Sequence, residues 1–293
     1  MKFGCGTGQT GRQLVLLAPG QDASSQFNQA VSDPRRHRRL LAETQRLRGR
    51  IYVQDGAIKP RQLSREGQHI QTADALSWHL LAVDNYDRVV ACVRYFSHGP
   101  GVSFSDLSVS QSAMAESPEF GPRVREAVES EIYHAARAGL AFVEIGGWAI
   151  SEQLRCTTEA IQMILAAYAL GQLNGGALGL SIATTRHNSS SILKRVGARP
   201  LLARGEEMPL YFDPRYDCEM ELLSFDSSSP NAKYADRVRD CRALLLQVPI
   251  VLPEPAGMPL GLLALHAALS DPHETPSYET ALQESGHSTV LTP

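Results

Sequence analysis

The chain has 293 residues, of which 43 % are hydrophobic and 20 % are charged, and its formal net charge is −3 at pH 7. This composition is typical of a globular protein with a sizeable core, and so small a net charge gives no support for nucleic-acid binding. The five cysteines are scattered without CxxC or Cys/His spacing, which excludes a recognisable zinc motif or disulfide framework. We find no signal peptide and no apolar stretch of membrane-spanning length, so we expect a reduced, cytoplasmic protein without an integral membrane span.

Residues 1–30 are rich in Gly, Gln and Ser, and we expect them to be loosely ordered. Asp33 and Pro34 then start a predicted helix that is crowded with arginines and has leucines along one side. A charge run of this kind usually forms a solvated helix face. An equal alternative is a docking surface for an acidic protein, because clustered arginines attract such a partner.

Residues 78–83 and 89–96 predict two strands joined by the polar turn 84–88 in a β-hairpin. Residues 118–138 carry apolar side chains at helical spacing with glutamates opposite, which predicts an amphipathic helix. This helix leads directly into the central part of the chain.

The central stretch begins with residues 141–150, which are apolar and rich in β-branched and aromatic types and therefore predict a buried strand. A long helix follows and ends at residues 174–176, Asn-Gly-Gly. A second strand over 177–185 and a short helix before Gly197 complete the stretch. The order of these elements predicts an α/β fold with a mixed sheet flanked by helices.

Residues 210–212 and 218–225 predict a last antiparallel strand pair, so we place the main domain at residues 31–226. Residues 227–293 are expected to form a C-terminal extension of unknown role. It contains one predicted helix near 234–248 and then a flexible tail rich in Pro, Ser, Thr and His.

The turn after the first central strand is a candidate anion site. A helix that starts directly after a buried strand leaves backbone N–H groups unpaired at the positive end of its dipole, and Arg155 adds a full charge there. The alternative is an ordinary strand-to-helix connection in which Arg155 is solvated. Thr157 and Thr158 are the candidate capping residues of this helix.

The first central strand itself carries unusual residues. Glu144 shares a face with Gly146, Trp148 and Ile150, and a carboxylate in an apolar strand is costly unless it has a function or a partner. An ion pair with Arg94 on the neighbouring strand is the structural alternative. The adjacent glycines 146 and 147 predict either a close backbone approach by a ligand or a β-bulge.

These residues carry a resemblance. The sequence from Arg155 to Ala160 resembles the Arg/Gln-x-x-Gly-x-Gly/Ala turn with which the GCN5-related N-acyltransferase (GNAT) superfamily grips the phosphates of coenzyme A or carrier-protein pantetheine. Residues 191–198 are similar to the segment that this superfamily usually ends in Tyr-Glu-Lys-x-Gly-Phe. Thr158 stands where Gly is usual, and Leu193 stands where many members have the Tyr that protonates the leaving thiolate. That proton must then come from elsewhere, unless the thiolate leaves unassisted.

The resemblance implies a GNAT-like fold, with a mixed, mostly antiparallel central sheet flanked by helices. It implies no tightly bound cofactor and no metal; the donor is acyl-phosphopantetheine on acyl carrier protein, or acyl-CoA. The implied cofactor-binding residues are Arg155, Cys156, Thr157, Thr158, Glu159 and Ala160.

Residues 35–225 look similar to the acyl-homoserine lactone synthases and the long-chain N-acyl amino acid synthases of this superfamily. The acidic loop of the lactone synthases is reduced here to the single carboxylate Asp74, and Gly147 occupies the position of a further arginine. We therefore expect an acyltransferase whose acceptor is a small amino acid, giving an N-acyl amino acid. The alternatives are an autoinducer synthase, an acetyl-CoA-dependent N-acetyltransferase and a catalytically silent acyl-binding protein.

Each site residue has an expected role under this reading. Glu144 would act as general base, and a backbone N–H near Trp148 to Ile150 would polarise the thioester carbonyl. His79 and Tyr211 are weaker candidates, since a His on an apolar strand or a Tyr in a late strand is usually a packing residue. The expected substrate-binding residues are Arg94, Gly146, Gly147, His79 and Tyr211, and the expected carrier-protein contacts are Arg36, Arg39 and Arg48.

Overall fold

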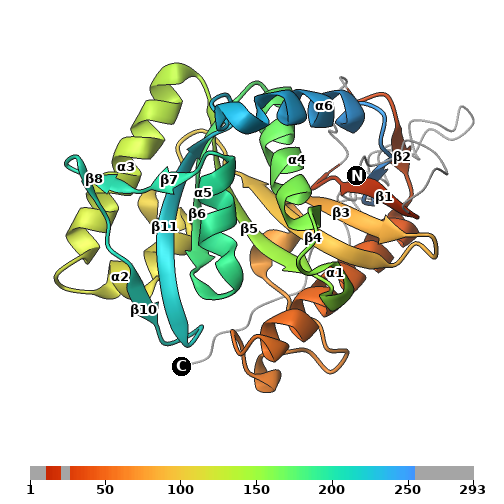
Figure 1. Ribbon diagram of the computed structural model, residues 1–293, viewed down its shortest axis with the longest axis horizontal. Helices are drawn as coiled ribbons and strands as arrows, with labels where there is room; N and C mark the ends of the chain where they lie inside the picture. The colour runs from red at the N-terminus through yellow and green to blue at the C-terminus, as the bar shows by residue number, and fades with distance from the viewer. Residues whose placement is uncertain (1–10, 21–26, 255–293) are drawn as a thin grey trace, which may run out of the picture. The chain divides into compact units, whose positions relative to one another are not determined.

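The computed structural model of the chain describes residues 11–20 and 27–254, and a ten-stranded mixed sheet runs through this part. The strand order is β10-β11-β6-β5-β4-β3-β1-β12-β2, with β7 pairing with β11 (Figure 1). The strands of this sheet are β1 (Arg12–Leu17), β2 (Ala30–Ser32), β3 (Trp78–Asp84), β4 (Val89–Ser97), β5 (Ala141–Ile150), β6 (Ala177–Thr184), β7 (Arg199–Pro200), β10 (Tyr211–Asp213), β11 (Cys218–Asp226) and β12 (Ile250–Leu252). β8 (Leu202–Ala203) and β9 (Glu206–Glu207) form a separate small pair.

Neighbouring strands are antiparallel except at the pairs β5/β6, β1/β12 and β12/β2. The expected mixed, mostly antiparallel sheet is therefore confirmed. The helices are α1 (Pro34–Gln54), α2 (Ala113–Glu116), α3 (Gly121–Ala138), α4 (Glu159–Leu173), α5 (Ser189–Val196) and α6 (Ala235–Leu245). No helix of the described residues is long and apolar enough to cross a membrane.

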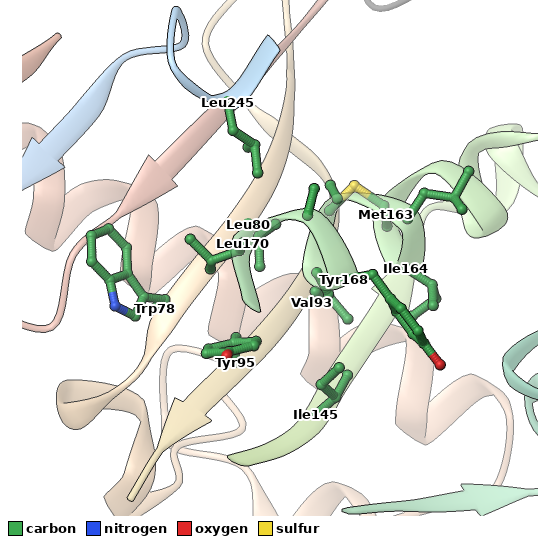
Figure 2. Close-up of a cluster of buried hydrophobic side chains, with 14 of the residues drawn as sticks. Trp78, Leu80, Val93, Tyr95, Ile145, Met163, Ile164, Tyr168, Leu170 and Leu245 are labelled. Carbon is green, nitrogen blue, oxygen red and sulfur yellow. The ribbon is translucent and has the colours of Figure 1, made fainter. Parts of the chain in front are cut away.

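Side chains of the central strands alternate between two apolar layers, as the period of two requires. Leu80, Val93 and Ile145 point toward α4 and join a large core with that helix and α6 (Figure 2). Leu81 and Cys92 point to the opposite face, where they pack against α1. The apolar side of α3 forms a third cluster with β6 and β11. The sheet is thus covered on both faces (Figure 1).

The predicted helices form where their sequence signals lie. Asp33 caps α1, because its carboxylate accepts the N–H of Arg36 at 2.9 Å, and Pro34 occupies the first turn. Gly139 ends α3 in the left-handed conformation, with φ of 68°. α4 is buried on nearly all sides, which explains why its sequence is apolar around most of the helix.

Two parts of the sequence-based domain plan are wrong. Residues 12–17, expected to be loosely ordered, form the buried strand β1 between β3 and β12. The end of the main domain is not at residue 226, because α6 packs on α4 and β12 joins the sheet, so the compact unit extends to Glu254. Residues 1–10 and the predicted flexible tail from residue 255 onward lie outside the described residues.

Candidate active site

β5 and β6 diverge in the middle of the sheet. Their parallel pairing covers Ala141–Glu144 with Ala177–Leu180, and beyond it no pair between these two described strands is formed, although β5 continues to Ile150. A cavity of about 500 Å³ fills the gap and is lined by both strands. Backbone groups on this edge of β5 are therefore open to a ligand that enters between the strands.

The cavity reaches both faces of the sheet. On one face its wall includes Ile164 of α4 and Ile192 of α5, and on the other it includes Arg94 of β4 and Glu144 of β5. A ligand approaching from the α4 side can thus meet a second ligand approaching from the α1 and α3 side.

A β-bulge changes the course of β5 where the strand borders the cavity. The register with β4 shifts between Cys92 and Arg94, opposite Gly147, which has a φ of 58°. A Cβ on Gly147 would lie 3.0 Å from Nη1 of Arg48, so both backbone angle and space require glycine. The sequence offered a β-bulge or a close approach by a ligand as reasons for the paired glycines. The bulge is present. Both glycines also line the cavity.

Side chains hold the carbonyl groups of this bulge. The Cys92 thiol donates to the carbonyl oxygen of Gly147 at 3.4 Å, and the Tyr52 hydroxyl donates to that of Trp148 at 3.2 Å. Burial raises the pKa of the Cys92 thiol to about 11 and also raises that of Tyr52. Both groups thus stay protonated and remain donors at neutral pH.

Glu144 lines the cavity and has two partners of its own. Its Oε2 lies 2.9 Å from Nε2 of His98, and its Oε1 accepts the backbone N–H of Ser108 at 2.9 Å. The ion pair with Arg94 that the sequence suggested is absent, because Arg94 is directly opposite Gly146 and bonds elsewhere. Glu144 is therefore a buried carboxylate that faces the cavity without a guanidinium partner.

Arg94 belongs to a buried charge cluster. Arg48 donates to Oδ1 of Asp74 at 2.7 Å, while Arg94 lies 3.3 Å from the same oxygen and donates to Oε1 of Gln71 at 2.7 Å. Burial alone would raise the pKa of Asp74, but the hydrogen bonds and charge of Arg48 outweigh it and hold that pKa well below its usual range. Two guanidinium groups thus share one carboxylate, which leaves one net positive charge beside the cavity.

Three sequence-based assignments are corrected on this side of the sheet. The Arg48 side chain is completely buried, so it cannot contact a carrier protein. His79 is 1 % exposed and lies 2.8 Å from the carbonyl oxygen of Asp74, and burial lowers its pKa to about 4, so it is a neutral core residue outside the cavity wall. Tyr211 packs in the α3 cluster and does not line the cavity, whereas Tyr216 does.

On the α4 side, part of the predicted donor turn lies in the cavity wall. Arg155, Cys156, Thr157 and Ala160 line the cavity. Thr158 is exposed and outside the wall, and Glu159 is buried against Arg12 at 3.3 Å. In the first turn of α4 the N–H of Glu159 donates to Oγ1 of Thr157 at 3.2 Å, while the N–H groups of Ala160 and Ile161 have no intrahelical acceptor by geometry.

Asp55 at the end of α1 holds this mouth of the cavity together. Its Oδ1 accepts from Nη2 of Arg155 at 2.6 Å, and its backbone carbonyl accepts from Arg186. Arg186, His98, Ser108 and Gln71 carry no site signal in the sequence, because nothing in the local sequence shows that they meet in space.

Arg36 and Arg39 lie at the other end of α1. Both pair with Asp87 in the β3–β4 turn, and Arg39 also pairs with Glu43. Sixteen helical residues separate Arg36 from Tyr52, which corresponds to roughly 24 Å along the helix axis. Their charges are thus partly neutralised and distant from the cavity.

No protein-family model matches the sequence, and no curated protein matches it. Among solved structures, the chain is similar to BjaI, a CoA-dependent acyl-homoserine lactone synthase, at 15 % identity and a TM-score of 0.50 over 87 % of this chain and 100 % of that one. FeeM, an N-acyl amino acid synthase from uncultured soil microbes, matches at 9 % identity and a TM-score of 0.40, covering 62 % and 82 % of the two chains. Arylalkylamine N-acetyltransferase 2 from Aedes aegypti matches at 13 % identity and a TM-score of 0.41, covering 64 % and 94 %.

At this level of identity a likeness establishes the fold alone, and the BjaI match extends over that whole protein. The described part of this chain contains the splayed parallel pair β5/β6 and, at its edge, the turn that joins β5 to α4. The chain therefore has a GNAT-like acyltransferase fold and resembles the acyl-homoserine lactone synthases, as its sequence motifs predict.

Proposed function

We propose that the protein is an N-acyltransferase that moves a fatty acyl chain from a thioester donor to the α-amine of a small amino acid. The observation that carries this proposal is the cavity through the splayed sheet, with the turn at Arg155 on one face and a buried carboxylate and guanidinium on the other. In the reaction a C–N bond forms, the C–S bond of the thioester breaks, and the acceptor ammonium loses two protons, of which one ends on the leaving thiol and one is released.

The donor enters from the α4 side. Its phosphate would lie against the first turn of α4 and Arg155, where backbone N–H groups and a cation favour an anion. The pantetheine arm would then follow the open edge of β5, and a backbone N–H near Trp148 to Ile150 would stabilise the developing oxyanion. This edge has no strand partner within the described chain. Its backbone N–H groups are therefore free of ladder hydrogen bonds on that side and can donate to a ligand.

The acceptor enters from the opposite face. The excess positive charge of the Arg48–Asp74–Arg94 cluster favours a ligand with a carboxylate, and Arg94 and Gln71 both line the cavity. Glu144, also in the wall, would take the proton that the ammonium must lose before attack. An amino acid carries both groups that this side of the cavity can bind.

We also propose a revised docking surface for acyl carrier protein, the basic patch of five exposed cations Arg46, Arg50, Lys59, Arg61 and Arg65. No ion pair is formed by these five within the part of the chain that the structure describes. Arg46 and Arg50 lie on α1, whose C-terminal end reaches the donor mouth through the Asp55–Arg155 pair, and residues 63–69 pack on Gly49 of the same helix. Its charge suits an acidic carrier better than Arg36 and Arg39 do.

The test is a transfer assay with purified protein. We would incubate it with acyl-CoA or acyl carrier protein thioesters of several chain lengths, together with a mixture of amino acids or with S-adenosylmethionine, and identify products by mass spectrometry. We expect N-acyl amino acids, and Glu144→Gln should lower kcat by about a hundredfold or more while the protein stays folded. Lactone products would favour the autoinducer alternative, and absence of any acyl product would refute the proposal.

A further inference from the structure

Glu144 stands between the cavity and a second titratable side chain, His98, which directly follows β4. The imidazole Nε2 lies 2.9 Å from Oε2 of Glu144, and the imidazole is outside the cavity wall. Only 10 % of the Glu144 side chain and 5 % of the His98 side chain are exposed. The two groups are therefore arranged in series from the cavity outward.

The surrounding residues fix this arrangement. The His98 ring lies between Phe96 and Phe142, with centroid distances of 4.3 and 6.4 Å, and its backbone N–H donates to the carbonyl oxygen of Phe142 at 2.9 Å. The other oxygen of Glu144 is held by the N–H of Ser108. The carboxylate thus has one oxygen bound to the backbone and one bound to a group that can accept a proton.

Residues 103–108 form the surface segment beside this pair. Asp106 is exposed there, and hydrogen bonds from Ser103 hold its pKa below the usual range, with a smaller contribution from the charge of His98. The same segment supplies the Ser108 N–H to Glu144. The charged groups recorded around the imidazole are therefore Glu144 on its inner side and Asp106 on its outer side.

We propose that His98 is a positioning and relay residue that removes the proton from Glu144 after each transfer. This inference rests on the proposed function, because acyl transfer from a thioester to an ammonium yields an amide, a thiol and one proton. Glu144 takes that proton, Oε2 passes it to the unprotonated Nε2 of His98, and the imidazolium releases its Nδ1 proton to water near Asp106; exchange with water then returns the ring to the Nδ1–H tautomer before the next transfer. Bonds and charges balance without any further reactant.

The test compares His98→Gln with His134→Gln, a substitution of the same type at an exposed position of α3. The glutamine amide can accept or donate a hydrogen bond at the position of Nε2, so it can still pair with Glu144, but it cannot carry a proton. We expect His98→Gln to lower kcat at least tenfold with both KM values within twofold of the wild type, and added imidazole to restore part of the rate. His134→Gln should behave as the wild type.

A structural role for His98 predicts different results. If His98→Gln retains full kcat, or if its rate is low but does not respond to imidazole, the relay is refuted while the proposed function stands. A wild-type protein that forms no acyl product would refute both. Should His98→Gln fail to fold, a proton inventory of kcat in H₂O–D₂O mixtures with the wild type decides: a curved plot supports two protons in motion, and a linear plot contradicts the relay.

Discussion

Arg48 and Asp74 form an ion pair that is shut off from solvent, with 0 % and 2 % of their side chains exposed. Arg94, on a neighbouring element, shares the same carboxylate. Removing one partner of a buried pair leaves uncompensated charge, which typically costs about 3–5 kcal/mol. Asp74 is thus the residue on which the acceptor side of the cavity depends for its stability.

We expect Asp74→Asn to lower the free energy of unfolding by about 3–5 kcal/mol, because two guanidinium groups would then lack a counter-charge. Urea denaturation would measure this. Glu129→Gln is the matched control, since its pair with Arg125 is exposed and should contribute less than about 1 kcal/mol. If Asp74→Asn does not fold, Arg48→Gln in the same chain should restore folding, because it removes the completely buried charge; equal stability of Asp74→Asn and wild type would contradict the cluster's role.

His79 should make stability depend on pH. Its pKa in the folded protein is lowered to about 4 from the ordinary 6.5, mainly because it is buried. Between these values the unfolded chain binds the proton and the folded protein does not, so stability is complete above pH 6.5 and falls as the pH drops toward 4. The buried neutral His79 therefore accounts for about 3 kcal/mol of the fall in unfolding free energy between pH 6.5 and pH 4. In His79→Gln we expect that fall to be smaller by the same amount. Parallel pH profiles for the two proteins would contradict this.

Much of the fold was predictable because its signals are local. The β3–β4 hairpin, α1, α3, β5, α4 and β6 all follow from periodicity, caps and turn residues within a short window. β1 and β12 were missed for a physical reason. β1 is a short apolar run with one partner strand on each side, and β12 has three residues whose pairing depends on strands more than 200 positions away.

The candidate site was predictable in its strand and turn, and not in its contacts. Glu144 and Gly147 stand out locally as a carboxylate and a glycine within an apolar strand, and Arg155 stands out as a cation in the turn before a helix. His98, the partner of Glu144, could not be recognised from the sequence, because only the pairing of β4 with β5 brings the two side chains together. Arg48 was misassigned as a surface cation, although its spacing from Leu40, Thr44 and Ile51 puts it on the buried side of the helix.

The bulge at Gly147 should be intolerant of any side chain. Gly147→Ala would combine a positive φ with a Cβ 3.1 Å from that of Arg94, and we expect a loss of about 1–3 kcal/mol in unfolding free energy. Gly146→Ala is the control, because its nearest neighbour would be 3.8 Å away and its φ is not positive. Thermal denaturation of both variants measures the difference, and equal midpoints would show that the bulge can adapt.

The basic patch predicts a donor-specific effect. Arg50→Glu with Arg65→Glu should raise the KM for acyl carrier protein by about tenfold at low salt, because reversed charges repel an acidic partner, and the effect should shrink as salt screens it. The KM for acyl-CoA should stay unchanged, since the phosphate turn at Arg155 is intact. Arg35→Glu with Arg38→Glu, exposed at the far end of α1, is the matched control. A larger effect from this control would move the docking surface to the start of α1, and equal loss with both donors would show that the patch acts on the cavity itself.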